Sequence, residues 1–181
     1  MTFDPDLVRA CTRCSLATSR THVVVGSGSL SSRLLVIGEA PGRDEDLQGQ
    51  PFVGRSGQLL FRLLVEEVGL SREECYVTNT LKCRPPGNRA PVPAELAACR
   101  PWLDEQRDES TAPVTLAVGL TAAREVLGAT LPMGRIHGRP RHLGRGSGLA
   151  TYHPAAALRN PEIVDVMRAD LQVVRALLEN A

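Results

Sequence analysis

Four of the five cysteines in the sequence have a spacing that suits the binding of a metal ion or a metal cluster. Cys11 and Cys14 form a C-x-x-C pair, and Cys83 and Cys99 follow much later in the chain. A local pair of thiolates joined to two distant ones can enclose one tetrahedral site, and both zinc and an iron–sulfur cluster accept such ligands. The spacing leaves these two alternatives open. The fifth cysteine, Cys75, lies in a predicted strand, where we expect a buried structural thiol.

Three polar residues each follow a short apolar run, at the point where the run ends. They are Glu39, Asn79 and His153. Three polar side chains at such positions are the first indication of a functional site. In α/β proteins the site lies outside the carboxyl ends of the parallel strands. We therefore expect these three side chains to share one site.

The elements that must position these residues alternate between strand-like and helix-like patterns. Short apolar runs predict strands at 34–37, 75–78, 114–118 and 148–152. Helical spacing of apolar residues predicts helices at 56–68, 94–107, 121–127 and 160–179. The segments 39–57 and 85–93 are rich in Gly, Pro and polar residues, and we expect loops there.

This alternation predicts the fold class, a three-layer α/β/α sandwich around a four-stranded, mainly parallel sheet. No linker divides the 181 residues. We expect a single domain over residues 1–181, with an N-terminal segment that carries the C-x-x-C pair.

The composition excludes a disordered tail and a uniformly basic surface. Hydrophobic residues make up 43% of the chain, and 21 basic residues face 20 acidic ones, for a net charge of +1. Only Lys82 among the basic residues is a lysine. A local basic patch is still possible, and Arg135, Arg139 and Arg141 crowd one Pro/Gly-containing segment. That segment is either a solvated loop or a set of phosphate contacts, and its closeness to His153 in sequence favours phosphate contacts.

The N-terminus lacks the apolar region of a signal peptide, and no window approaches the ~18 consecutive apolar residues of a membrane span. We expect a cytoplasmic, monomeric protein that makes no contact with membranes. Its cysteines would be reduced in that compartment, which favours metal or cluster ligation over disulfides.

Three longer motifs combine with the cysteines into one pattern. They are Gly38-Glu-Ala-Pro-Gly42 with its extension to residue 60, Val77-Thr-Asn-Thr-Leu-Lys-Cys83 with its extension to residue 91, and Thr151-Tyr-His-Pro-Ala155 with its extension to residue 159. The set closely resembles the family-four uracil-DNA glycosylases, the iron–sulfur branch of that superfamily. The resemblance covers about residues 11–159. It implies a [4Fe–4S] cluster bound by Cys11, Cys14, Cys83 and Cys99.

The resemblance also implies the chemistry, the hydrolysis of the N-glycosidic bond of uracil in single- or double-stranded DNA as a step of DNA repair. His153 would donate a hydrogen bond to O2 of the departing uracil. Glu39 would position the attacking water or offset the charge of an oxocarbenium-like sugar. Glu45 is a candidate for a second catalytic carboxylate, or for the wall that rejects the methyl group of thymine.

Substrate binding, by the same resemblance, requires the uracil to leave the DNA stack and enter a pocket. Phe52 would stack on the flipped base and Asn79 would read its Watson–Crick edge. Glu39 and His153 would contact the substrate too. The backbone of three further residues would form the pocket floor: Ala40, Pro41 and Gly42.

The sequence departs from the family pattern at Ala155, where the family usually has Ser after His-Pro. The lost hydroxyl removes one potential phosphate contact, so we expect weaker DNA binding with intact base chemistry. Residues 84–91 contain no His, which a sibling branch uses to trap DNA covalently, so ordinary turnover is favoured. Two alternatives stay open: an iron–sulfur or zinc nucleic-acid-binding protein of the same superfamily with little or no catalysis, and a redox or structural metalloprotein with no DNA role.

Overall fold

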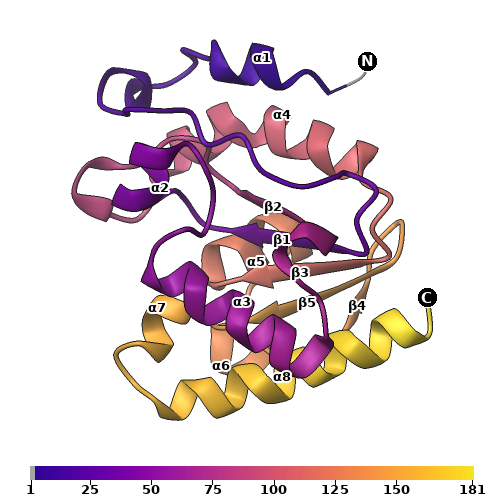
Figure 1. The fold of residues 1–181 in the computed structure, drawn as a ribbon. Helices are drawn as coiled ribbons and strands as arrows, with labels where there is room; N and C mark the ends of the chain where they lie inside the picture. Colours follow the sequence, from indigo (N-terminus) through magenta and orange to yellow (C-terminus); the bar gives the residue numbers. More distant parts are fainter. Residues whose placement is uncertain (1–2) are drawn as a thin grey trace.

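A sheet of five strands lies at the centre of the part of the chain that this computed structural model describes, residues 3–181 (Figure 1). The strand order is β2-β1-β3-β5-β4. The strands are β1 (Leu34–Gly38), β2 (Cys75–Asn79), β3 (Val114–Val118), β4 (Arg141–His142) and β5 (Ser147–Thr151). The first four in the spatial order run parallel, and β4 pairs antiparallel with β5 at the edge.

The predicted parallel strands are confirmed, but the prediction of four strands missed β4. Both residues of β4 are exposed, so a two-residue edge strand leaves no apolar or alternating pattern in the sequence. By contrast, every residue of β1, β2 and β3 is buried. Continuous apolar runs of this kind are typical of parallel strands that are covered on both faces.

Helices cover both faces of the sheet. On one face, α3 (Arg55–Val68) and α8 (Glu162–Glu179) pack against the strands. On the other face lie α4 (Pro93–Glu109), α5 (Leu120–Leu127) and the short α6 (Met133–Ile136). Figure 1 shows these layers with the sheet between them. The layered α/β architecture that the sequence predicted is therefore present.

Two segments that the sequence predicted as loops contain short helices. Segment 39–57 holds α2 (Arg43–Gln48), which Gly49 ends in the left-handed conformation, with φ at 70°. Segment 85–93 contains a 3₁₀ turn at Pro86–Asn88. Within residues 3–181 the remaining α-helices are α1 (Pro5–Arg9) and α7 (Pro154–Ala157), and two further 3₁₀ turns lie at Ser15–Thr18 and Arg72–Glu74.

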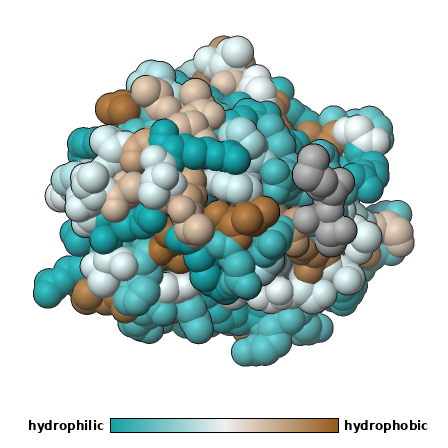
Figure 2. All heavy atoms as spheres, turned by 90° about the horizontal axis from the view of Figure 1, so that it is seen from above, coloured by the Kyte–Doolittle hydropathy of each residue, from teal (hydrophilic) through white to brown (hydrophobic). Residues whose placement is uncertain are grey.

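The N-terminal segment lies across α4, at the top of Figure 1. Val8 and Leu16 of this segment pack with Trp102 of α4 in a small hydrophobic cluster of their own. Figure 2 shows this face from above, with hydrophobic residues in separate patches among hydrophilic ones. The segment therefore packs on the main body through apolar contacts and through hydrogen bonds, among them that of the Val24 N–H to the Lys82 carbonyl at 2.7 Å.

In the described part of the chain, none of the helices combines the length and the hydropathy needed to cross a membrane.

Candidate active site and cysteine cavity

A cavity of about 730 Å³ opens at the carboxyl ends of the parallel strands, where the sequence predicted the site. We call it the cleft. All of the residues predicted to bind substrate line it, together with the second candidate carboxylate. They are Glu39, Ala40, Pro41, Gly42, Glu45, Phe52, Asn79 and His153.

Glu39 is the first residue after β1 and is half-buried at the cleft. Its backbone carbonyl accepts hydrogen bonds from the Leu81 N–H, at 3.0 Å, and from the Thr80 hydroxyl. The Thr121 hydroxyl donates to carboxylate atom Oε2. Among residues 3–181, Thr121 is the one hydrogen-bond donor to this carboxylate. Oε1 is therefore available to a water molecule or a substrate.

His153 precedes the short helix α7, and its ring caps that helix. Nδ1 accepts a hydrogen bond from the Ala155 N–H at 3.2 Å, which leaves the ring proton on Nε2. Burial lowers the pKa of His153 below its usual 6.5, although the charges of Glu39 and Glu45 oppose this effect. The ring is therefore a neutral donor through Nε2–H.

Gly119 allows the imidazole to lie this close to the end of β3. Its φ is +92°, and a Cβ there would come within 3.2 Å of the His153 Cβ. A larger residue would therefore push the ring out of its place.

Phe52 is buried at 6% exposure although its backbone is in the left-handed region, with φ at 53°. Such a conformation in a bulky residue needs support from its surroundings. Arg72 supplies it, since Nη1 donates to the Phe52 carbonyl at 3.0 Å and Nη2 donates to the Pro51 carbonyl. Gly57 lies directly against the same carbonyl, at a place where a Cβ would be 1.9 Å from the oxygen.

Asn79, the last residue of β2, is 2% exposed and lies beside Gly38, the last residue of β1. A Cβ on Gly38 would be 2.4 Å from Asn79 Oδ1 and 2.5 Å from Phe52 Cζ. The absence of a side chain at Gly38 therefore lets the amide and the phenyl ring meet at the floor of the cleft. Within the described residues, no hydrogen bond is recorded for the amide itself, which leaves both of its polar atoms for a ligand.

Glu45 also lines the cleft, but both of its carboxylate oxygens are engaged by the backbone. Oε2 accepts from the Gly42 N–H at 3.1 Å, and Oε1 accepts from the Gly54 N–H at 2.8 Å. The side chain thus joins the start of α2 to the start of α3, with Phe52 between them.

The three arginines predicted to contact DNA do not line the cleft. Arg135 is in α6, Arg139 follows that helix, and Arg141 is in β4, opposite Gly148. Gly148 is near the start of β5, so Arg141 lies toward the end of the sheet that faces away from the cleft.

Four other arginines line the cleft, and our sequence reasoning did not single them out. They are Arg43, Arg55, Arg89 and Arg159. Arg89 forms a two-pronged ion pair with the buried Glu95, whereas Arg55 and Arg159 are exposed. The closeness of Arg55 to Phe52, and of Arg159 to His153, was the available sequence signal.

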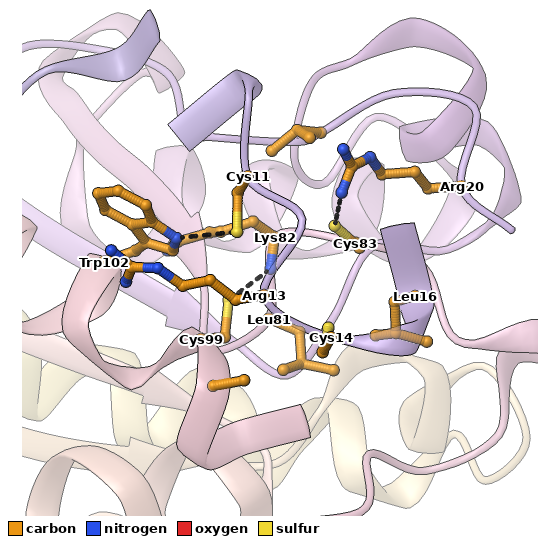
Figure 3. A pocket seen from close by; sticks show the side chains of 12 residues that line it. Cys11, Arg13, Cys14, Leu16, Arg20, Leu81, Lys82, Cys83, Cys99 and Trp102 are labelled. Atoms are coloured by element: carbon orange, nitrogen blue, oxygen red, sulfur yellow. Dashed lines mark hydrogen bonds between the residues drawn. The ribbon is translucent and has the colours of Figure 1, made fainter. Parts of the chain in front are cut away.

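Cys11, Cys14, Cys83 and Cys99 line a second, smaller cavity between the N-terminal segment and α4. Figure 3 shows the four sulfur atoms around one common space. Cys75 is absent from this cavity; it is fully buried in β2, and burial raises its pKa to about 12. The separation of Cys75 from the other four agrees with the prediction.

Three N–H groups donate to sulfur atoms of this cavity, each at 3.3 Å. The donors are Trp102 Nε1 to Cys11, Arg20 Nη1 to Cys83, and the Lys82 backbone to Cys99. Hydrogen bonds of this type stabilise thiolates and tune bound clusters. Burial raises the pKa of Cys83 to about 11, against the opposing effect of Arg20, so a bound cation would be needed to hold this thiolate fully ionised.

Among residues 3–181, no three His, Cys, Asp or Glu side chains gather closely enough to hold one metal ion. In a four-iron cluster each thiolate bonds a different iron, so the ligands surround a larger volume than they do around a single zinc ion. The four thiols that line this cavity are of the ligand type that an iron–sulfur cluster accepts.

The family model described as "Uracil DNA glycosylase superfamily" matches residues 25–175. The "Type-4 uracil-DNA glycosylase" of Thermotoga maritima is 40% identical over 95% of this chain and 91% of its own length. The "Type-4 uracil-DNA glycosylase" of Saccharolobus solfataricus is 36% identical over 97% of this chain and 85% of its own length. A "Type-5 uracil-DNA glycosylase" of Pyrobaculum aerophilum is 29% identical, over 85% and 73%. The chain, with its cleft at the carboxyl ends of the strands, belongs to the uracil DNA glycosylase superfamily and resembles most closely, among these, the type-4 enzymes.

Proposed function

We propose that this protein is a DNA-repair enzyme, a uracil-DNA glycosylase that hydrolyses the N-glycosidic bond of uracil and leaves an abasic site. Its type-4 relatives carry this activity in their names. The observation that carries the proposal is the convergence of Glu39, Phe52, Asn79 and His153 in one cleft, from four separate segments of the chain.

Recognition begins when uracil leaves the DNA stack, because no side chain can reach its glycosidic bond inside a duplex. Phe52 stacks on the extruded base, and the Asn79 amide pairs with its N3–H and O4. The backbone of residues 40–42 forms the floor. The ordered left-handed turn at Phe52, held by Arg72, fits a rigid stacking platform.

In the chemical step, the bond between sugar C1′ and uracil N1 breaks, and its electron pair moves onto the uracil ring. His153 Nε2–H donates to O2, where negative charge develops, and this interaction strengthens toward the transition state. Water attacks C1′, and the Glu39 carboxylate orients that water and offsets the positive charge on the sugar. The proton that the water loses passes to the solvent, from which the uracil anion takes up a proton. We assign these two roles to Glu39 because both oxygens of Glu45 hold backbone N–H groups.

DNA is the proposed partner in both its single-stranded and its double-stranded form. Arg55 and Arg159 lie at the rim of the cleft, where the phosphates beside an extruded base would pass. Arg135, Arg139 and Arg141 are proposed as contacts to DNA beyond the cleft.

The proposed cofactor is a [4Fe–4S] cluster on Cys11, Cys14, Cys83 and Cys99. When bound, it would crosslink the N-terminal segment to the turn after β2 and to α4, with no part in the hydrolysis. Residues 1–181 are proposed to act as one domain with an N-terminal cluster-binding segment, as a cytoplasmic monomer.

The decisive experiment measures uracil release by the purified protein from single- and double-stranded DNA, alongside DNA binding. We expect catalytic release by the native protein and loss of at least about 10²-fold in Glu39→Gln, which keeps the shape of the side chain and removes its charge. Binding to uracil-containing DNA without release would instead identify a nucleic-acid-binding protein with little or no catalysis.

A further inference from the structure

Lys82 is the one lysine of the chain, and it is buried at 1% exposure. Its ammonium donates three hydrogen bonds, to Thr78 Oγ1 at 2.7 Å, to the Asn79 carbonyl at 2.7 Å and to Gln106 Oε1 at 2.6 Å. An ammonium has three N–H donors, so each of them has a partner.

All three acceptors are neutral. A charge buried without an opposite charge is costly, and buried charges in proteins are normally paired. No ion pair is recorded for Lys82 within residues 3–181, which include every Asp and Glu of the chain. Two thiols of the cysteine cavity lie beside Lys82: Cys83 is the next residue, and Cys99 Sγ accepts from the Lys82 backbone N–H at 3.3 Å.

Gln106 extends the network on the side of α4. Its Nε2 donates to the Val25 carbonyl at 2.8 Å and to the Tyr76 hydroxyl at 2.7 Å. Lys82 therefore lies where the N-terminal segment, the end of β2 and the helix that carries Cys99 meet. Figure 3 shows Lys82 among the cysteines on the wall of their cavity.

Resting on the proposed function, we propose that Lys82 is a positioning residue for Asn79, with its charge balanced by the cysteine thiolates. The ammonium fixes the Asn79 carbonyl at the end of β2, and this sets the direction of the amide that reads uracil. The thiolates, held together by a bound cluster, supply the negative charge that keeps the ammonium in place. Lys82 thereby joins the cysteine site to base recognition.

The identity of the residue fits this role. Every other basic residue of the chain is an arginine, yet a planar guanidinium cannot direct three bonds at acceptors arranged around a single nitrogen atom. Lysine is the basic side chain that satisfies this arrangement, so Lys82→Arg should not restore the function of the site.

The test is a double-mutant cycle on single-turnover uracil excision. Lys82→Met keeps the length of the side chain and removes its charge. It should slow excision by about 10- to 100-fold in the native background, the scale of losing one hydrogen bond to a charged group. In an Asn79→Ala background the same change should slow excision by less than about threefold, because there the amide that Lys82 positions is already gone.

Two controls separate positioning from general damage. Lys82→Met in a His153→Ala background should keep its full effect, since His153 acts on a different atom of the base. Arg84→Met, which removes a basic side chain two residues away and outside the network, should leave excision near the native rate. Equal losses in the native and Asn79→Ala backgrounds would overturn the positioning role.

A second readout is independent of activity. Iron release to a chelator, followed by visible absorption, should be about tenfold faster in Lys82→Met than in the native protein or Arg84→Met, because the thiolates lose their counter-charge. Equal release rates would overturn the charge balance. If Lys82→Met does not fold, Thr78→Val, which removes one acceptor, can carry both measurements with smaller effects of the same sign. A native protein that releases no uracil would refute the proposed function, and the iron measurement would still test the link to the cysteines.

Discussion

The phenyl ring of Phe52 faces the imidazole of His153, with 6.1 Å between the ring centroids and 28° between the ring planes. One ring comes from the segment after β1 and the other from the segment after β5. Both residues line the cleft, and burial lowers the pKa of His153. The platform for the base and the donor to the base are therefore parts of a single packed unit.

Replacing His153 by Ala should slow the chemical step by roughly 10²–10³-fold, the scale of losing one donor to a developing oxyanion. Binding of uracil-containing DNA should change little, because the hydrogen bond strengthens only as charge develops. Single-turnover kinetics and a binding titration measure the two separately. The exposed His142 in β4 provides the matched control, and His142→Ala should retain native rates. A near-native rate in His153→Ala would remove this residue from catalysis.

The lowered pKa of His153 predicts how stability depends on pH. In the unfolded chain the imidazole binds a proton near its usual pKa of 6.5, whereas the folded protein resists protonation to lower pH. The contribution of the buried neutral ring is therefore fully present above pH 6.5 and is lost as the pH falls through the folded pKa. Urea unfolding between pH 5 and pH 7 should show a smaller pH dependence in His153→Gln than in the native protein. Parallel curves for the two proteins would contradict this.

Replacing any one of Cys11, Cys14, Cys83 and Cys99 by Ala should lower iron content and thermal stability together, because ligands that hold a cluster also hold the N-terminal segment. Cys75→Ala is the matched control, since Cys75 is buried in β2 away from the cavity. It should cost some stability through lost packing and leave the iron content unchanged. Iron analysis and thermal unfolding test both statements, and loss of iron in Cys75→Ala would show that the ligand set is wrong.

Asn79→Asp replaces the amide donor by an acceptor that faces uracil O4. One lost hydrogen bond plus the repulsion between two buried acceptors should cost roughly 3–4 kcal/mol, or about 10²–10³-fold in uracil excision. The carboxylate can accept from the amino group of cytosine, so a weak cytosine activity should be sought in the same assay. Asn88 also lines the cleft, and Asn88→Asp should excise uracil at close to the native rate. Undiminished excision by Asn79→Asp would require a different base-reading residue.

Salt dependence of DNA binding separates the two sets of arginines. Neutralising Arg55 and Arg159 together should flatten the plot of log affinity against log salt by about one unit for each lost phosphate contact. The same measurement after neutralising Arg139 and Arg141 tests whether these two arginines, which the sequence indicated, contact DNA phosphates. If only this second pair flattens the slope, DNA lies along the β4 edge and the assignment to the cleft arginines is wrong.

Much of the fold follows from local sequence patterns. The apolar run at residues 34–37 ends in Gly38, and the structure places β1 there with the glycine included. The helix predicted at residues 56–68 begins one residue earlier and ends at the same residue. These elements are fully buried or strongly amphipathic, so the spacing of their apolar residues predicts which positions are buried. The same patterns placed Glu39, Asn79 and His153 at strand ends, and the structure gathers them in one cleft.

The contacts that sequence reasoning missed join residues far apart in the chain. Arg72 supports Phe52 from twenty residues away, and no periodic pattern connects them. The six residues of α2 include one large apolar side chain, the exposed Leu47, so no helical stripe marks the element. The place of Lys82 depends on partners from β2 and α4, which only the folded chain brings together.

Glu45 fastens Gly42 to Gly54 and so closes the segment that carries Phe52 into a ring. Because this loop is closed by the protein's own hydrogen bonds, it is ordered before DNA binds. Binding therefore carries no entropic cost for ordering the loop. The base-binding pocket is therefore preformed, and the conformational change on binding takes place in the DNA. The pace of capture would then be set by how readily a lesion swings out of its strand, and a uracil already loosened by mispairing with guanine should be captured sooner than one paired with adenine.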